Sequence, residues 1–299
     1  MMRIASGLAG TLLILLASAA ASAASDQTFD RQVPAQPRGV VEISNVSGKI
    51  EVSGWDRAEV SVHAELVGGS EGVEMNSEGG HTAIKVRQPA YYGRGQARLQ
   101  VKIPKDSELA VSGVSADVTT SGVLGVQRLS AISGKITAEI AGAEVELKTV
   151  SGSVQVKGHG QPAQLRASTV SGDVHLERAG GDIEAGTVNG ALIVSVDGAR
   201  SVRAHTTSGE VRVEGTLAHG ATVEASSVSG NLTVRASADG GFAYEVSSFS
   251  GGISDCFNAS PERVSKYGPG TRLTGSRGEG MGHVRLKTMS GNVELCDRR

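Results

Sequence analysis

Hydrophobic and polar residues alternate along most of this chain, in short segments that share one glycine. The segment from Thr149 to Val156 reads Thr-Val-Ser-Gly-Ser-Val-Gln-Val, and related segments recur along the sequence. In most copies valine, isoleucine or leucine stands two and four residues after the glycine, with polar residues between. A period of two residues is typical of a strand with one buried and one exposed face. Each segment therefore predicts a short strand that begins just after the glycine.

The glycines recur at a nearly constant interval. The steps are 18 to 21 residues in the middle of the chain, 65 at the start and 40 at the end, between Gly48, Gly113, Gly134, Gly152, Gly172, Gly190, Gly209, Gly230, Gly251 and Gly291. A fixed period of this size is typical of repeat proteins. The same residue type returns in column after column, which favours parallel stacking over a sandwich or propeller of hairpins. We predict an all-β fold, a parallel β-solenoid with rungs of about 20 residues.

The Ser-Gly pair marks a change in the alternation. Before it, Leu147 and Thr149 belong to the set of alternate residues that faces the core. After it, the core-facing set continues at Val154, an odd number of residues from Thr149, so the alternation has shifted by one residue. A glycine that tolerates positive φ at a corner would account for this shift. The preceding serines are expected to bond to neighbouring backbone or stack. The copy at Gly113 breaks the pattern, because Ser115 occupies an aliphatic position.

The start of the chain has the features of an export signal. Residues 1–23 combine an early Arg3, an apolar run from Leu12 to Leu16 and the small residues Ala21, Ser22 and Ala23. This pattern predicts a signal peptide that is removed after Ala23. The mature protein is expected in the periplasm or at the surface of a bacterium, without a transmembrane anchor. Residues 24–39 are polar and predict an exposed linker.

One domain is expected over residues 40–299. Its parts are predicted as an irregular β-rich N-terminal cap at 40–109, regular repeats at 110–256, an excursion that caps the C-terminal end at 257–285 and a last rung at 286–299. In the excursion, Ser260 and Pro261 are typical of a helix start, so a loop with a short helix is expected there.

Two cysteines occupy the same position in the repeat. Cys256 and Cys296 each follow a repeat glycine by five residues. Adjacent rungs lie about 4.8 Å apart, and a disulfide needs Cα atoms about 4.4 to 6.8 Å apart. The sequence therefore predicts a Cys256–Cys296 disulfide between adjacent rungs, so that the 40-residue step holds one rung and an excursion.

Composition and charge exclude several classes of function. The chain has 41 glycines but only 4 phenylalanines, 4 tyrosines and 1 tryptophan, which suits a narrow core of small aliphatic side chains. Lysine and arginine total 29 against 31 acidic residues, so the chain is nearly neutral. It has no basic stripe of the kind that binds nucleic acid, and nucleic-acid binding is not predicted. The seven histidines show no metal-site spacing, and no neighbouring repeats supply clustered carboxylates. No catalytic, metal or cofactor residues are predicted.

Several motifs together resemble a known family. The opening stretch from Ile43 to Asp56, the Thr-x-Ser-Gly repeats and a Gly-Pro-Gly segment before the last rung are similar to a bacterial β-strand-repeat family of unknown function, labelled "putative adhesin". The resemblance covers nearly all of the chain beyond the signal. It implies a solenoid protein of the bacterial envelope and carries no catalytic or binding residues.

Two classes of function remain open. The favoured one is a non-enzymatic adhesin-like or scaffold module that binds an envelope protein or a surface glycan, with a stress sensor or regulatory partner as a variant. The other class is a polysaccharide-active enzyme, which a groove lined by convergent ionisable groups would favour. Candidate contact residues are Tyr91, Tyr92 and Tyr267. We expect function where the repeat is absent, at residues 68–95 and 258–280.

Overall fold

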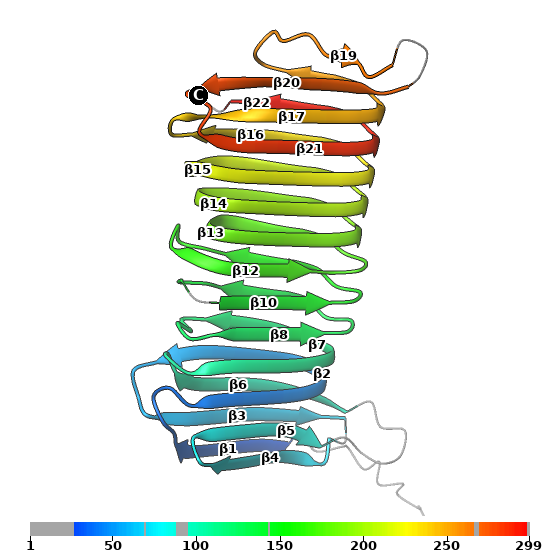
Figure 1. Ribbon diagram of the computed structural model, residues 1–299. Helices are drawn as coiled ribbons and strands as arrows, with labels where there is room; N and C mark the ends of the chain where they lie inside the picture. Colours follow the sequence, from blue (N-terminus) through cyan, green and yellow to red (C-terminus); the bar gives the residue numbers. More distant parts are fainter. Residues whose placement is uncertain (1–26, 69, 88–94, 143, 266–268, 298–299) are drawn as a thin grey trace, which may run out of the picture.

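The chain forms one long stack of β-strands (Figure 1). The computed structural model describes residues 27–68, 70–87, 95–142, 144–265 and 269–297. Every element in these ranges is a strand, and no helix occurs among them. The prediction of an all-β, solenoid-like fold is therefore confirmed.

The strands fall into three groups along the stack. The N-terminal group comprises β1 (Gln27–Pro34), β2 (Val40–Trp55), β3 (Glu59–Val67), β4 (Gly72–Glu78), β5 (His81–Arg87), β6 (Gln96–Pro104) and β7 (Glu108–Ser121). The middle group comprises β8 (Gln127–Ala131), β9 (Ile136–Glu139), β10 (Glu144–Thr149), β11 (Val154–Lys157), β12 (Pro162–Ser168), β13 (Val174–Asn189), β14 (Leu192–Ser208) and β15 (Val211–Ser229). The C-terminal group comprises β16 (Leu232–Ala238), β17 (Gly241–Ser250), β18 (Ile253–Asp255), β19 (Glu262–Arg263), β20 (Thr271–Gly278), β21 (Gly282–Ser290) and β22 (Val293–Cys296).

Parallel pairing brings equivalent positions of successive rungs together. Leu192 of β14 lies beside Val174 of β13 on one side and Val211 of β15 on the other. All three side chains are fully buried. Each such side chain contributes about 1.5 to 3 kcal/mol when it is removed from water. Because every rung covers the next, the core continues along the whole stack.

The repeat glycines are required by close approach between rungs. A Cβ atom on Gly190 would lie 1.9 Å from the carbonyl oxygen of Gly172, and one on Gly209 would lie 1.9 Å from that of Gly190. Real Cβ atoms do not come this close to backbone. The column therefore needs glycine for space. The positive φ expected at the corners occurs at some of these glycines, such as Gly48 (+117°) and Gly209 (+153°), but not at Gly190.

The repeat after β2 is in register, contrary to the expectation at Gly113. Gly113 lies beside Asn45, and Ala116 lies beside Gly48. Ala116 therefore occupies the glycine column of this rung, and Val118, beside Ile50, fills the aliphatic position that we had assigned to Ser115. Alignment on the wrong glycine caused the apparent break.

The N-terminal end is built out of chain order. β2 pairs in parallel with β7 on one side and with β5 and β6 on the other, so it is a full rung inside the region expected to be an irregular cap. β3 and β4 add antiparallel strands beyond β6 and β5. The expected linker at 24–39 is wrong for residues 27–34, because β1 pairs antiparallel with β3 and Phe29 and Val33 pack on the core.

The C-terminal end is also built out of chain order. β21 pairs in parallel with β15 and with β17, and β22 pairs with β16 and with β18. The rung that is last in sequence therefore lies inside the stack, where Figure 1 shows red β21 between yellow β15 and β17. β20 pairs antiparallel with β17 beyond it. The rung expected at 286–299 as the end of the stack is therefore second from the end, and it begins at Gly282.

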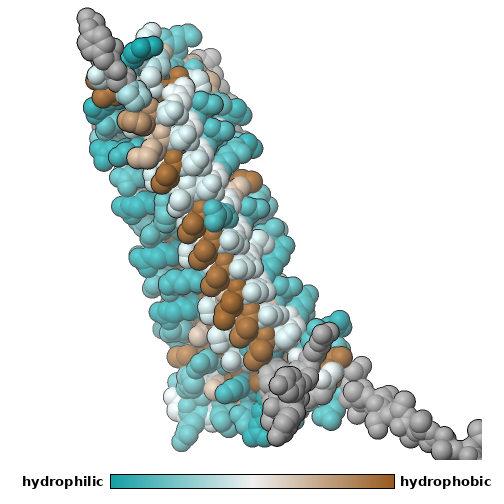
Figure 2. Space-filling model, turned by 90° about the vertical axis from the view of Figure 1, so that its right-hand side faces the viewer, coloured by the Kyte–Doolittle hydropathy of each residue, from teal (hydrophilic) through white to brown (hydrophobic). Residues whose placement is uncertain are grey.

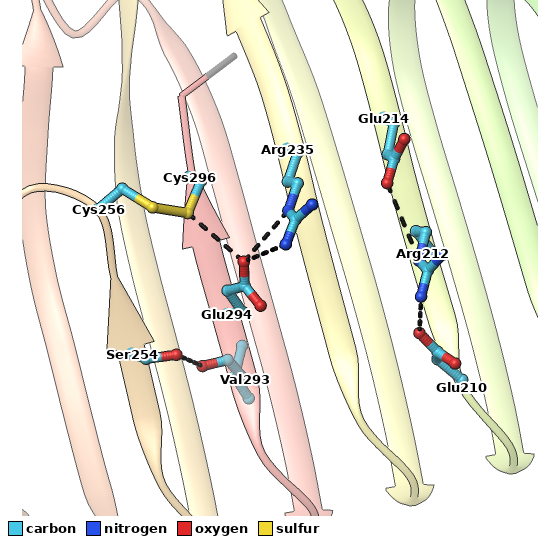
Figure 3. A network of polar contacts seen from close by, with 9 residues as sticks. All are labelled: Glu210, Arg212, Glu214, Arg235, Ser254, Cys256, Val293, Glu294 and Cys296. Carbon is cyan, nitrogen blue, oxygen red and sulfur yellow. Dashed lines mark hydrogen bonds and ion pairs between the residues drawn. A yellow bond between two sulfur atoms is a disulfide. The ribbon is translucent and has the colours of Figure 1, made fainter.

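A disulfide holds this inserted rung on one side. Cys256 follows β18 and Cys296 ends β22, and their Cα atoms lie 5.0 Å apart (Figure 3). The predicted disulfide between adjacent rungs is confirmed. On the other side of β22, Glu294 accepts hydrogen bonds of 3.1 and 2.8 Å from Nε and Nη2 of Arg235 in β16. The carboxylate of Glu294 raises the pKa of Arg235.

The short helix expected at Ser260 is absent. Glu262 and Arg263 form β19, which pairs antiparallel with Arg272 and Thr271 of β20. A helix of one or two turns is marginal in water, and this segment has no apolar face to bury. The open edge of β20 offers backbone partners instead. Beneath it, the rings of Phe242, Tyr244 and Phe257 pack at centroid distances of 5.7 to 6.4 Å.

Candidate functional site

A column of apolar side chains is exposed along one corner of the stack. Each residue stands two places before the glycine column, and we name these positions the apolar stripe. In spatial order it comprises Val46, Val114, Ile132, Val150, Val170, Val188, Thr207, Val228, Met289 and Phe249. All but Thr207 are apolar, and these nine are 41 to 59 % exposed.

The stripe runs along the molecular surface with one polar interruption, at Thr207. Figure 2 shows a diagonal brown band along the rod, bordered by pale small residues and by hydrophilic side chains farther out. The residue after each stripe position is serine in every rung but one, where it is Asn189. Soluble monomers rarely expose contiguous apolar patches beyond about 300 to 600 Å². A band of this length is therefore a candidate contact surface.

A buried polar column turns the stripe outward. The residue before each stripe position is threonine or serine in most rungs, and its side chain points inward. Thr169 donates a hydrogen bond of 3.0 Å to the carbonyl oxygen of Gly152, and Thr187 donates one of 3.1 Å to that of Gly172. In the N-terminal rung Asn45 has this role, since its Nδ2 donates to the carbonyl oxygen of Ala97 at 3.1 Å. Thr206 and Ser227 occupy the same column and are buried without a hydrogen-bond partner. Because the side chains of this column point inward, the next residue along the strand faces solvent.

Charged residues form a second column on the face that carries β8, β10 and β12. From one rung to the next, the column alternates in sign through Arg128, Glu146, Arg166, Glu184, Arg203, Glu224, Arg285 and Glu245. Ion pairs follow this order, such as Arg166–Glu184 at 3.4 Å and Arg203–Glu224 at 3.6 Å. We name this column the charge ladder. It alternates only because Arg285 of β21 is inserted between Glu224 and Glu245.

Two shallow grooves lie on the charge ladder. One, of about 230 Å³, is lined by Arg166, Asp182, Glu184 and Arg203. The other, of about 430 Å³, is lined by Glu224, Glu245, His283 and Arg285. Such grooves were the feature expected of a polysaccharide-active enzyme. Their carboxylates are exposed and paired with arginines, however, whereas a general acid needs a carboxyl group kept protonated by burial.

Hydrogen bonding in the ladder favours the ionised carboxylate. Lys148 bonds to Glu146 and lowers the pKa of this carboxyl group, and Arg166 and Arg128 on the neighbouring rungs lower it further. These contacts stabilise the charged form of Glu146 and do not prepare this group for proton transfer. Within the described part of the chain, no three histidine, cysteine or acidic side chains are placed to hold a metal ion.

Reversing one charge tests the ladder. Arg285→Glu is expected to lower the free energy of unfolding by about 1 kcal/mol, because it places a third carboxylate between Glu224 and Glu245 on adjacent strands. Arg285→Gln, which removes the charge without reversing it, is the control and is expected to cost less. Denaturant melts at low salt measure both, and equal stability of the two variants would contradict the role of the ladder.

The predicted contact residues are not described by the structure. Tyr91, Tyr92 and Tyr267 lie outside the described residues, as does the expected signal peptide at 1–23. Function was expected at residues 68–95 and 258–280, whereas the stripe lies within the repeat. Sequence reasoning missed the stripe, although a signal was present in the aliphatic residue that precedes the serine in most copies.

The comparisons with known proteins identify the family. The sequence profile of Toastrack DUF4097 matches residues 40–296. The chain belongs to this family. A search of curated proteins found no significant match to the Toastrack chain. Among the ranges that the structure describes, no helix is long and apolar enough to cross a membrane.

Several solved structures are similar to the Toastrack chain at low sequence identity. A protein of Parabacteroides merdae described as a putative adhesin is 9% identical, with a TM-score of 0.54, 90% of this chain covered and 96% of that one. A putative adhesin of Bacteroides fragilis is 9% identical, with a TM-score of 0.42 and coverages of 91% and 98%. A putative lipid binding protein of Parabacteroides distasonis is 11% identical, with a TM-score of 0.45 and coverages of 89% and 96%. At these identities, the first of them supports the fold alone.

Proposed function

We propose that this chain is an exported, non-enzymatic, adhesin-like interaction module of the bacterial envelope. The observation that carries the proposal is the apolar stripe, an exposed band along the rod that small and hydrophilic residues border in Figure 2. Burial of such a band against a partner is the main driving force for association. The stripe is the binding surface, and an envelope protein or a surface glycan is the class of partner.

Export is supported by two features of the chain. Residues 1–23 have the composition of a signal peptide. The disulfide between Cys256 and Cys296 belongs to an oxidising compartment, such as the periplasm or the cell surface. The name putative adhesin on the Parabacteroides merdae protein of similar fold agrees with this location.

The absence of catalysis is supported by the surface chemistry. Apart from Asp182 and His283, the acidic and basic side chains of the two grooves belong to the charge ladder, in which each glutamate has an arginine on a neighbouring rung. Glycoside hydrolysis needs two carboxyl groups that flank a substrate and are free to act as acid and as base or nucleophile. Glu184 and Glu224 are instead exposed and paired with arginines.

Capture from envelope fractions tests the proposed function. The immobilised mature protein is expected to retain an envelope component, and the double variant Val150→Lys/Val170→Lys is expected to retain roughly tenfold less. Ile193→Lys is the matched control, because Ile193 is an exposed aliphatic residue, at 37 % exposure, that stands three places after the glycine column and so outside the stripe. Equal retention by all three proteins, or none by the wild type, would overturn the proposal.

A further inference from the structure

We propose that the partner of the apolar stripe is a second copy of the same chain, packed antiparallel along the stripe. This inference rests on the proposed function and names its partner. It makes the protein a homotypic binding module, with two rods joined lengthwise through Val150, Val170, Val188 and their neighbours in the column.

The size of the stripe matches what a stable dimer needs. The nine apolar residues are 41 to 59 % exposed, which corresponds to on the order of 700 Å² of surface, close to the roughly 800 Å² that each partner buries in a standard interface. The serines that border the stripe add to this area. A face of this area can therefore hold two copies together without another contact region.

The repeat spacing of the stripe selects its partner. One side chain projects from every rung, and rungs are about 4.8 Å apart. A partner fills the gaps between these side chains along the whole stripe only if its own side chains have the same spacing. Interdigitation of two such ladders is the packing seen in dry interfaces between paired β-sheets. A second copy of the chain has side chains with this same rung spacing.

The border of the stripe permits two like faces to approach. The position after each stripe residue is serine, or Asn189 in one rung, so this border carries no charge. The charge ladder lies three or more columns away, beginning with residues such as Glu146 and Arg166. Two copies therefore meet at the stripe itself without burying an ion, which would be costly. The nearest charged side chains, such as Lys148 and Lys287, stand two positions before the stripe and are exposed at its margin.

The side-chain volumes favour the antiparallel arrangement. The large residues Met289 and Phe249 lie at the C-terminal end of the stripe, and Val46 and Val114 lie at the N-terminal end. In a parallel pair, Phe249 would meet Phe249 and force one end of the rods apart. In an antiparallel pair with a two-fold axis at the centre, Phe249 meets Val46 and Met289 meets Val114, which keeps the separation even.

Sedimentation of the mature protein tests the proposal. The wild type is expected to be a dimer at about 10 μM, and Val150→Lys/Val170→Lys is expected to be a monomer under the same conditions. Ile193→Lys is expected to remain a dimer. Far-ultraviolet circular dichroism of all three establishes that the lysines, at exposed positions, leave the fold intact. A monomeric wild type, or a double variant that remains dimeric, would overturn the proposal.

Cysteine pairing tests the orientation. The centre of the stripe lies between Val170 and Val188, so these residues meet across an antiparallel interface. A mixture of Val170→Cys and Val188→Cys proteins is expected to give mainly mixed disulfide dimers on mild oxidation. A parallel interface would give each variant disulfide-bonded to itself, and this result would overturn the antiparallel arrangement.

The failure of this inference is distinguishable from the failure of the proposed function. If the wild type is monomeric but captures an envelope component through the stripe, the homotypic interface is wrong and the interaction module stands. Flotation with phosphatidylcholine vesicles supplies the second distinction. Stripe-dependent flotation of a monomer would assign the stripe to a lipid surface and overturn the homotypic interface. If the wild type is monomeric and binds nothing, both proposals fail.

Discussion

Replacing Gly190 with alanine is expected to lower the free energy of unfolding by about 3 kcal/mol. The new Cβ would lie 1.9 Å from the carbonyl oxygen of Gly172, which belongs to the backbone of the neighbouring rung. That backbone cannot move aside like the end of a flexible side chain, so β13 and β14 must separate at this corner. Their separation weakens the parallel pairing on both sides of it. Chemical denaturation followed by circular dichroism measures the loss.

Gly198 provides the matched control for this substitution. It has a φ of +72°, and a Cβ there would meet no atom within 4 Å. Alanine at Gly198 therefore has only the cost of a left-handed backbone, about 1 to 2 kcal/mol. A loss at Gly190 no greater than the loss at Gly198 would mean that the rungs can relax, and that close approach does not explain the glycine column.

The repeat could be predicted from the sequence because each of its columns obeys a simple rule. Val154 and Val174 must be aliphatic since they lie beside each other in the core, and Gly152 must be glycine since the preceding rung, at Gly134, passes too close for a side chain. Such constraints apply rung after rung and therefore appear as a period. The position of Cys256 and Cys296 in one column was sufficient to predict their bond for the same reason.

The stripe was missed because aliphatic residues were assigned to the core by type. Val150 follows the inward-facing Thr149 and is 46 % exposed, although its side chain is as apolar as that of the buried Val154. Only the direction of the backbone at the corner distinguishes the two valines. Periodicity gives that direction within a strand, but it does not carry through a turn that shifts the phase.

The ends of the stack could not be predicted from the repeat alone. The insertion of β2 and of β21 and β22 between other rungs leaves the period of the sequence unchanged, because each inserted rung has the same columns as its neighbours. The order of the rungs in the stack is encoded instead in particular pairs of residues on neighbouring rungs. Arg285 has a carboxylate on both sides only in the inserted position, and Cys296 reaches Cys256 only from there. These pairs can be interpreted only when the neighbouring rungs are known.

The largest expected effect is that of the disulfide. Replacing both Cys256 and Cys296 with alanine is expected to lower the free energy of unfolding by about 4 kcal/mol, the chain-entropy value for a closed loop of about 40 residues. The bond closes a loop with a sequence separation of 40 that contains β19, β20 and β21 and most of β22. Without it, the unfolded chain gains the freedom of that whole loop. Denaturant melts of the variant and of the oxidised wild type measure the difference.

The variant is nevertheless expected to reach the same fold, since the inserted rung has other partners. β21 is paired on both sides by β15 and β17, and Glu294 of β22 bonds to Arg235 independently of the sulfur atoms. The loss should therefore appear first as faster amide hydrogen exchange in β22 and then as a lower denaturation midpoint. Reduced wild-type protein is the control for side-chain packing at the two positions. If reduction leaves both the midpoint and the exchange of β22 unchanged, pairing with β16 and β18 alone holds the inserted rung, and the disulfide has no role in its stability.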